Sequence, residues 1–243
     1  MSTGAATRPG NRARSGVARG ARRRQPIEFE TLTYTVDDGI ALITLNRPER
    51  LNAVNGAMGA ELPQVWETFR DDPEALVGIV TGSGSRAFCS GADIADLPRM
   101  ITDDEGNALP ESVRWTAMQN EVWKPVICAV NGDVLGGGLH FVAESDVVIA
   151  SQDARICDPH VSVGLTSAIE TIVLARRMPI GAVLRLALGG RSVGLDARRA
   201  YDLGMFDEIC PAGEVLDRAL ALARAMCGNS PSAMEHTKRA IWS

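Results

Sequence analysis

Three short apolar runs in the middle of the chain, each ending in a turn or a polar residue, constrain the fold more than any other feature. The runs are "ALVGIVTGSG" (75–84), "PVICAVNG" (125–132) and "DVVIAS" (146–151). Apolar runs of this length bounded by turn residues are typical of strands buried on both faces of a parallel sheet. Segments with helical spacing precede the first run, at 55–72, and separate the second from the third, at 137–145. This alternation predicts an α/β fold.

The rest of the chain supplies a hairpin near one end and helices near the other. The segment "FETLTYTVDDGIALITLNRP" predicts two strands joined by a turn at Asp38-Gly39. We also expect a helix over 112–123 and mainly helical segments from Ala168 onward. The polar segment between Arg99 and Pro110 is expected to be a surface loop rather than a domain boundary.

The first 25 residues differ in composition from everything that follows. They contain seven arginines and no acidic residue, and no apolar segment of a secretory signal follows the basic residues. Such a segment has no apolar surface to contribute to a core, so we expect a disordered tail. The expected organisation is therefore a tail at 1–25, an α/β core at 26–190 and a helical C-terminal region at 191–243.

Composition narrows the function classes. A net charge of −5 at pH 7 argues against nucleic acid as the main partner. No apolar run approaches the roughly 20 residues that span a bilayer, so no membrane association is expected. The five cysteines are odd in number, widely spaced and without a CxxC pair. They favour a reducing, cytoplasmic compartment and provide no metal-binding motif.

Two glycine-containing turns share one design. Gly91 precedes Ala92 and a segment in which Asp93 can cap a short helix, and a glycine triplet at 136–138 precedes the helical segment that contains His140. Glycines before a helix free the backbone to expose N–H groups, and the helix dipole adds partial positive charge there. Two such turns, each following a buried strand, can converge on one anionic oxygen and form an oxyanion hole.

Five segments, in order along the chain, resemble the crotonase superfamily, the enoyl-CoA hydratase/isomerase family. They are "ITLNRPERLNAVNGAMGAEL", "AFCSGADI", "KPVICAVNGDVLGGGLHFVAESDVVIAS", "DARRAYDLGMFDEI" and "NSPSAMEHTKRAIW". The resemblance implies a crotonase-like spiral of ββα units with a helical C-terminal region that forms a homotrimer or a dimer of trimers. It implies acyl-CoA thioester substrates, with CoA as part of the substrate and no separate cofactor.

The resemblance also implies the site residues. The N–H groups of Ala92 and Gly137 are expected to hold the thioester oxygen as it becomes an enolate. Leu51 and Ala53 are expected beside the adenine and pantetheine of CoA. The full set of residues expected to bind substrate is Leu51, Ala53, Gly91, Asp93, Ile94, Gly136 and Gly138.

Both positions at which hydratases of this family carry a catalytic glutamate are histidine in this chain. His140 stands two residues after the glycine triplet, and His160 follows Pro159 in "ARICDPHVSVGL". The only other histidine is His236. Because the first turn of a helix disfavours imidazolium, we expect a neutral His140 to act as the base that positions water, with His160 facing it across the substrate.

Three acidic residues are candidate orienters of the histidines. Glu144 lies four residues after His140, on the same helical face. Asp158 lies two residues before His160, and Glu170 lies ten residues after it as a possible substitute acid. A histidine beside a buried helix is also often a packed core residue, and Glu170 can equally be a solvated helix residue. Two histidines with Asp158 match the ligand types of an iron site, but the resemblance does not support a metal and none is expected.

Three functions remain open from the sequence. The first is enoyl-CoA hydratase/isomerase chemistry in fatty-acid or related acyl-CoA catabolism. The second is a carbon–carbon hydrolase acting on a β-dicarbonyl substrate, in which a neutral histidine activates water while the oxyanion hole holds the leaving enolate. The third is a non-catalytic acyl-CoA-binding subunit. The absence of both glutamates fits the third function, whereas histidines at both positions favour the first two.

Overall fold

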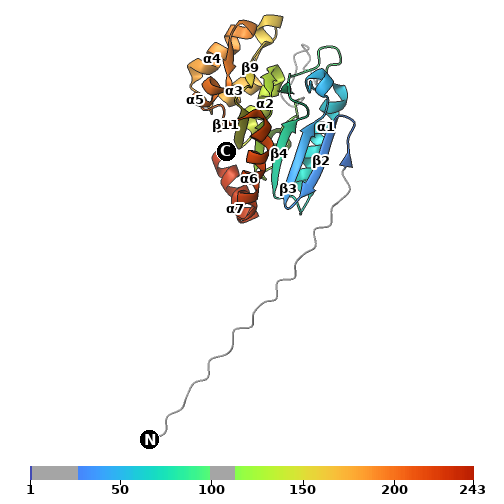
Figure 1. Cartoon of the computed structure of the whole chain (residues 1–243), viewed down its shortest axis with the longest axis vertical. Coiled ribbons are helices and arrows are strands. Elements are labelled where there is room, and N and C mark those ends of the chain that lie inside the picture. Colours follow the sequence, from blue (N-terminus) through green and yellow to red (C-terminus); the bar gives the residue numbers. More distant parts are fainter. Residues whose placement is uncertain (2–26, 99–112) are drawn as a thin grey trace.

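The computed structural model describes Met1 and residues 27–98 and 113–243 (Figure 1). The expected tail at 1–25, apart from Met1, and the expected loop between Arg99 and Pro110 lie outside the described residues. Within the described part, no helix combines the length and the apolar character that crossing a membrane requires.

The larger of two sheets has seven strands and contains the three predicted apolar runs. Its order is β1-β2-β3-β4-β6-β8-β11, antiparallel from β1 to β3 and parallel from β3 to β11. The strands are β1 (Ile27–Glu28), β2 (Leu32–Asp37), β3 (Ile40–Leu45), β4 (Val77–Gly82), β6 (Val126–Val130), β8 (Val147–Ser151) and β11 (Glu208–Cys210). Asp37 pairs with Ile40, which confirms the predicted hairpin turn at Asp38-Gly39. Every residue of β4 and β6 is buried, as continuous apolar runs predict.

The smaller sheet has four strands in the order β10-β9-β7-β5. The strands are β5 (Ala87–Cys89), β7 (Asp133–Leu135), β9 (Arg155–Cys157) and β10 (Gly194–Asp196). From β4 to β9 the chain alternates between the sheets, placing even-numbered strands in the larger sheet and odd-numbered strands in the smaller one. This winding is the spiral that the sequence predicts. Because β5, β7 and β9 are parallel neighbours, the loops that follow them emerge at one edge of the small sheet.

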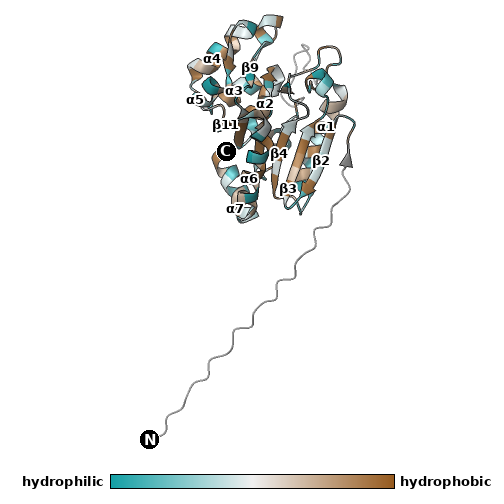
Figure 2. Cartoon of the chain, in the orientation of Figure 1, coloured by the Kyte–Doolittle hydropathy of each residue, from teal (hydrophilic) through white to brown (hydrophobic). Residues whose placement is uncertain are grey.

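Helices pack on both faces of the larger sheet. The helices of the described residues are α1 (Gly56–Asp71), α2 (Leu139–Glu144), α3 (Ile169–Leu174), α4 (Ile180–Gly189), α5 (Ala197–Asp202), α6 (Val215–Cys227) and α7 (Pro231–Trp242). One apolar core includes Trp66 and Phe69 of α1, and a second lies between α6 and the strands β4, β6 and β8. Both colours of the hydropathy scale occur on α6, as expected for a helix that buries Val215, Ala219 and Ala223 on one face (Figure 2).

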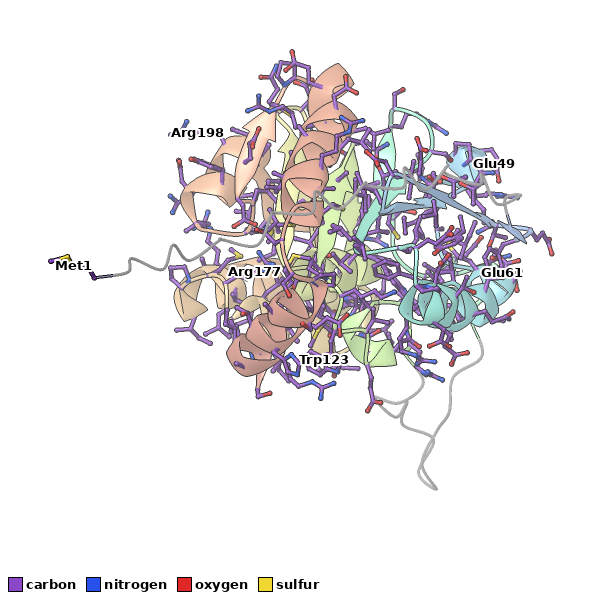
Figure 3. All side chains as sticks on the ribbon, turned by 90° about the horizontal axis from the view of Figure 1, so that it is seen from below. Met1, Glu49, Glu61, Trp123, Arg177 and Arg198 are labelled. Atoms are coloured by element: carbon purple, nitrogen blue, oxygen red, sulfur yellow. The ribbon has the colours of Figure 1, made fainter. Side chains whose placement is uncertain are left out.

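Glu61 of α1 forms hydrogen bonds with the residues just before the hairpin. Its carboxylate accepts hydrogen bonds from the backbone amides of Glu30, at 2.7 Å, and Thr31, at 3.0 Å, and from the Thr31 hydroxyl. Glu61 is labelled in Figure 3. These amides precede β2, so Glu61 supplies acceptors that the strand ladder does not.

Two expectations about local structure need correction. The predicted helix over 112–123 is wrong, because the described residues 113–123 form only a 3-10 turn at Met118–Asn120, and the Gln119 side chain accepts the amides of Trp115 and Thr116. Asp93 does not begin a helix; its side chain instead accepts the amide of Ala95 in a turn. The region 191–243 is mostly helical, as expected, and also contains the strands β10 and β11, one in each sheet.

We expect Asn55→Ala to lower the free energy of unfolding by about 1 kcal/mol, because the Asn55 side chain caps α1 by accepting the amide of Met58. Ser230→Ala is the matched control, since Ser230 occupies the same position before α7 without a capping bond from its side chain. Urea unfolding of both variants measures the difference. Equal losses in the two variants would contradict the assigned cap.

Candidate active site

Three loops meet at the edge of the small sheet where its parallel strands end. The loop after β5 carries Gly91 and Ala92, the loop after β7 carries the glycine triplet, and the segment after β9 carries Asp158 and His160. Gly91 has φ +87°, and a methyl group added there would lie 2.8 Å from the amide nitrogen of Gly137. Only glycine permits this approach, so the first two loops are in direct contact.

Both loops present backbone N–H groups at this contact. Val54 donates to the carbonyl of Gly91 at 2.8 Å and accepts from the amide of Asp93 at 2.9 Å, so the Ala92 amide between them is directed away from Val54. Gly137 is the second residue of the short 3-10 helix Gly136–Gly138 that continues into α2, and the first amides of a helix lack intrahelical partners. Two backbone amides at such a contact are what the expected oxyanion hole requires.

The residues expected along the CoA wall are connected to the first glycine loop. Arg47 donates to the carbonyl of Ala53 at 2.6 Å and pairs with Asp93 at 3.0 Å. The amide of Ala95 and the guanidinium of Arg47 hold the pKa of Asp93 below its usual value. Ser90 donates its amide to the carbonyl of Leu51 at 3.1 Å. The structure therefore brings Leu51, Ala53 and Asp93 together with the loop.

Ile94 is 91% exposed. Its side chain is therefore available to a ligand that lies along this wall.

His140 is buried on α2, and both of its ring nitrogens have partners. Nδ1 lies 3.3 Å from the side-chain amide nitrogen (Nε2) of Gln119, and Nε2 of His140 lies 3.4 Å from Glu170 Oε2. The ring also meets the edge of Trp115, with centroids 5.7 Å apart. Burial, with a smaller contribution from His160, lowers the pKa of His140 to about 4, so the ring is neutral at pH 7.

His160 has a different environment, at the beginning of a 3-10 turn (His160–Val163). Its Nδ1 lies 2.6 Å from Asp158 Oδ1 and 3.1 Å from Glu170 Oε1. The hydrogen bond to Asp158 raises the pKa of His160 despite partial burial, and Glu170 adds to the effect. Its Cε1 lies 3.8 Å from where a methyl group on Gly136 would be, so the ring borders the second glycine loop.

The two carboxylates behind His160 are buried. Burial alone would raise the pKa of Asp158, but hydrogen bonds from His160 and Ser167 outweigh it and lower that pKa. Burial raises the pKa of Glu170. Ser167 Oγ lies 2.5 Å from Asp158 Oδ2 and 3.1 Å from Glu170 Oε1, so the two carboxylates share one hydroxyl.

Glu144 does not act as the direct partner expected for His140. It accepts a hydrogen bond from the Thr116 hydroxyl and another from Gln119, and burial raises its pKa. The link to His140 therefore runs through the Gln119 amide. Glu170, in contrast, is in contact with both histidines because α3 packs against α2.

Asp158, His160 and Glu170 offer ligand atoms within 4.8 Å of one another, which is close enough for a metal ion. Each close pair also matches a hydrogen-bond donor with an acceptor: the His160 N–H faces the two carboxylates, and the Ser167 hydroxyl faces Asp158. We therefore interpret the cluster as a hydrogen-bonded network.

Sequence reasoning missed Gln119, Trp115 and Ser167. Gln119 and Trp115 fall in the segment wrongly predicted as a helix, where the sequence gives no sign that they approach α2. A methyl group on Gly137 would lie 2.6 Å from the Trp115 ring, so this ring covers the second loop. Ser167 lies three residues before Glu170, and that spacing was the available signal.

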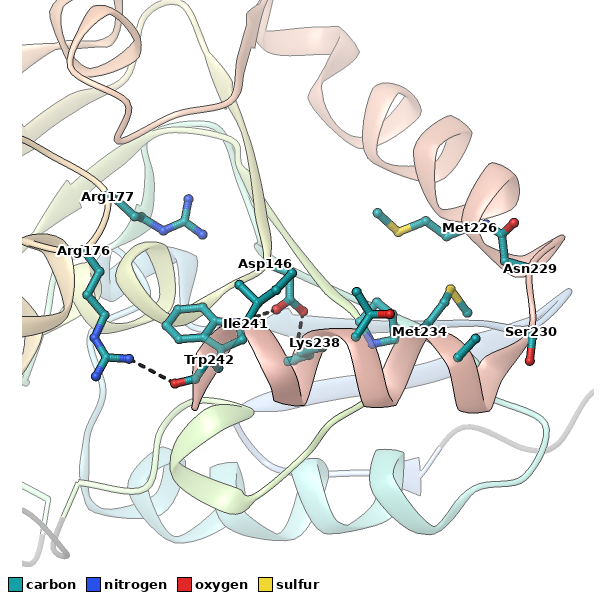
Figure 4. Close-up of a pocket in the computed structure, with 13 residues that line it drawn as sticks. Asp146, Arg176, Arg177, Met226, Asn229, Ser230, Met234, Lys238, Ile241 and Trp242 are labelled. Carbon is teal, nitrogen blue, oxygen red and sulfur yellow. Dashed lines mark hydrogen bonds and ion pairs between the residues drawn. The ribbon is translucent and has the colours of Figure 1, made fainter.

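An apolar groove of about 800 Å³ lies elsewhere, along α7 and the turn before it (Figure 4). Lys238 and Trp242 of α7 point toward Asp146 on its floor, at 2.8 Å and 2.9 Å. None of the expected site residues lines this groove.

Comparison with known proteins identifies the fold and the kind of site. A family model described as enoyl-CoA hydratase/isomerase matches residues 35–242. A short-chain-enoyl-CoA hydratase of Clostridium acetobutylicum is 30% identical over 223 residues, covering 88% of this chain and 82% of the relative. A solved enoyl-CoA hydratase/isomerase of Mycobacterium paratuberculosis has a TM-score of 0.79 and 38% identity, with coverage of 88% and 82%.

A further solved structure, a carnitinyl-CoA dehydratase of Mycobacterium avium, is 33% identical with a TM-score of 0.74, covering 87% of this chain and 82% of its own. The fold and the paired glycine loops define an α/β enzyme of the crotonase superfamily. The chain belongs to its enoyl-CoA hydratase/isomerase family, whose members act on acyl-CoA substrates.

The raised pKa of His160 predicts how stability varies with pH. A group whose pKa is higher in the folded state stabilises the fold fully below its unfolded pKa, about 6.5 for histidine, and loses that contribution as pH rises through the folded pKa. We therefore expect the loss of unfolding free energy caused by His160→Gln to be larger near about pH 6 than near about pH 9.

Urea unfolding at several pH values measures this loss. His236→Gln, at an exposed histidine whose ring nitrogen lies against a backbone carbonyl, is the control whose effect is subtracted. A corrected loss that grows with pH would show that the assigned His160–Asp158 pairing is wrong.

Proposed function

We propose that the chain catalyses a reaction of acyl-CoA thioesters that passes through an enolate, in fatty-acid or related acyl-CoA catabolism. The N–H groups of Ala92 and Gly137 would hold the thioester oxygen. The observation that carries the proposal is the contact between the two glycine loops, with His160 bordering the second one. CoA is part of the substrate, and the proposal requires no further cofactor.

The histidines take over the proton transfers that glutamates perform elsewhere in the family. Support comes from their position, since the cluster of His140, His160 and Glu170 lies directly behind the glycine loops. A buried network with displaced pKa values is the environment in which acid–base groups are commonly found. The proposal favours hydration or double-bond isomerisation and retains carbon–carbon hydrolysis of a β-dicarbonyl as the second candidate.

The test is incubation with a panel of enoyl-CoA and β-ketoacyl-CoA thioesters, read by mass spectrometry and absorbance. Gain of water indicates hydration, an absorbance change at constant mass indicates isomerisation, and cleavage of the chain indicates hydrolysis. Binding of every thioester without turnover would contradict the enzymatic proposal and favour a non-catalytic acyl-CoA-binding subunit.

Gly137→Pro should reduce kcat by roughly a hundredfold or more, because it removes one N–H donor of the proposed oxyanion hole. Circular dichroism and binding of a CoA ligand establish that the variant is folded. A folded variant with full turnover would exclude Gly137 from the reaction.

His140→Ala and His160→Ala should each reduce kcat by roughly a hundred- to ten-thousandfold while CoA ligands still bind. The double variant should have a kcat only slightly below that of the less active single variant, because both side chains contact Glu170 and act as one unit. If both single variants stay within about threefold of the parent on its best substrate, the histidines have a structural role.

We also propose that the chain assembles as a homotrimer or a dimer of trimers. Ile180, Leu184 and Leu188 recur every fourth residue on α4 and are between 49% and 72% exposed. An exposed apolar stripe of this kind is a candidate contact surface for another chain. The apolar groove beside α7, with Ile241 exposed on it, supports participation of the C-terminal helices in contact with a second copy.

Light scattering at micromolar concentration should therefore give the mass of three or six chains. Leu184→Glu should shift the protein toward smaller species, whereas the neighbouring Arg185→Glu, which alters an exposed charge outside the stripe, should not. A monomeric parent protein would contradict the proposal.

A cytoplasmic location belongs to the same proposal. All five cysteines are free, and burial raises the pKa of each thiol, as is usual for unreactive packed cysteines in a reducing compartment.

A further inference from the structure

Hydrogen-bond geometry distinguishes the two histidines in a way that differs from the sequence-based prediction, which makes His140 the base and places His160 opposite it. The Gln119 carbonyl oxygen accepts the amides of Trp115, at 2.7 Å, and Thr116, at 3.2 Å. These bonds fix the orientation of the Gln119 amide, so its NH₂ group is the part that faces His140 Nδ1. An NH₂ group can only donate, and His140 Nδ1 therefore accepts.

A neutral imidazole that accepts at Nδ1 carries its proton at Nε2. In His140, Nε2 lies 3.4 Å from Glu170 Oε2. Because Nδ1 accepts from Gln119 and Nε2 carries the proton, neither nitrogen has a lone pair available for a substrate or a water molecule. The base role that the sequence predicts for His140 requires such a lone pair.

His160 has the complementary arrangement. Its Nδ1 is directed at Asp158 and Glu170, two acceptors, and so carries a proton. No described residue hydrogen-bonds its Nε2, and 23% of the side chain is exposed. The adjacent Cε1 borders Gly136 of the second glycine loop, so Nε2 is the nitrogen available on the side of the proposed oxyanion hole.

We propose that His160 is the proton-transfer group of this enzyme, acting through Nε2, and that Asp158, Glu170 and Ser167 are positioning residues. His140 is a neutral donor that orients Glu170. This inference rests on the proposed function, and it assigns the proton transfer to His160 alone instead of to a pair in which His140 is the base.

In hydration, His160 Nε2 removes a proton from water while the water oxygen bonds to the β-carbon and the thioester oxygen becomes an enolate. The imidazolium then returns the proton to the α-carbon as the enolate collapses. One water is added and the neutral ring is regenerated, so no second acid is required.

The charges around His160 are consistent with a stabilised imidazolium. Asp158 lies on its own segment, Glu170 comes from α3, and His140 on α2 is neutral. The other elements packed against the His160 turn are α4 and the turn Gly190–Ser192, whose charged residues Arg185 and Arg191 are exposed.

The chain contains only three histidines, so NMR of ring nitrogens in histidine-labelled protein can resolve each of them. His160 should carry Nδ1–H when neutral and titrate above about 6.5, the ordinary histidine value. His140 should remain in the Nε2–H form across the neutral range. A neutral His160 with Nε2–H, or a titrating His140 beside a non-titrating His160, would overturn the proposal.

Asp158→Asn and Glu170→Gln provide the second arm. Each should lower the His160 midpoint, by about 1–3 pH units for Asp158→Asn, and move the corresponding limb of the pH–rate profile by the same amount. Asp153→Asn, the same change at an exposed aspartate, is the control and should leave both unchanged. If the limb of the pH–rate profile does not move with the His160 midpoint measured by NMR, Asp158 and Glu170 are not positioning residues for catalysis. If one of the two variants does not fold, the other variant and the tautomers measured by NMR in the parent protein still test the proposal.

His140→Gln keeps a neutral N–H donor for Glu170 and should retain more activity than His160→Gln by tenfold or more. The reverse order would overturn the assignment. A stoichiometric loss of the His160 titration on adding micromolar Zn²⁺ would identify a metal site and also overturn it.

Failure of the proposed function can be separated from failure of this inference. Gly137→Pro should reduce kcat by roughly a hundredfold or more and leave the His160 midpoint unchanged. If no acyl-CoA is turned over although the histidine tautomers are as predicted, the proposed function and the catalytic role of His160 are wrong. The assigned hydrogen bonds of the two histidines are then still correct.

Discussion

The parallel pairing of β5, β7 and β9 is the constraint on which the rest of this structure depends. Because these strands run side by side, the loops that follow them must emerge together at one edge of the small sheet. Glycine at position 91 then lets the first loop approach the second until their backbones touch. Two turns that are separate in the sequence thereby meet at the proposed oxyanion hole.

The acid–base cluster depends on a second packing event, that of α3 against α2. It brings Glu170 between two histidines that lie 20 residues apart in the sequence and gives each of them a carboxylate oxygen. The low pKa of the buried His140 and the raised pKa of His160 follow from these unequal surroundings. The two histidines, which occupy the family's two catalytic positions, therefore differ in the pKa of their rings.

Much of this fold follows from local sequence. Continuous apolar runs predicted the buried strands, and Asp38-Gly39 predicted the hairpin turn. Motif resemblance pointed to the two glycine loops that the structure brings into contact, and their binding of a thioester stays a prediction. The sequence could not show that Gln119 folds back on the amides before it, since this bond replaces the expected helix. Nor could it show that Glu170 rather than Glu144 contacts His140, because that choice depends on helix packing and not on spacing along one helix.

The central claim is that the glycine loops and the His160 cluster generate an enolate from an acyl-CoA thioester. The most direct measurement is exchange of the α-hydrogens of a saturated acyl-CoA in D₂O, followed by mass spectrometry, since exchange requires an enolate but no completed reaction. The account predicts deuterium uptake with the parent enzyme, and uptake reduced by a hundredfold or more with Gly137→Pro and with His160→Gln. A parent protein that binds the thioester without any exchange, or a His160→Gln variant that exchanges at the parent rate, would contradict it.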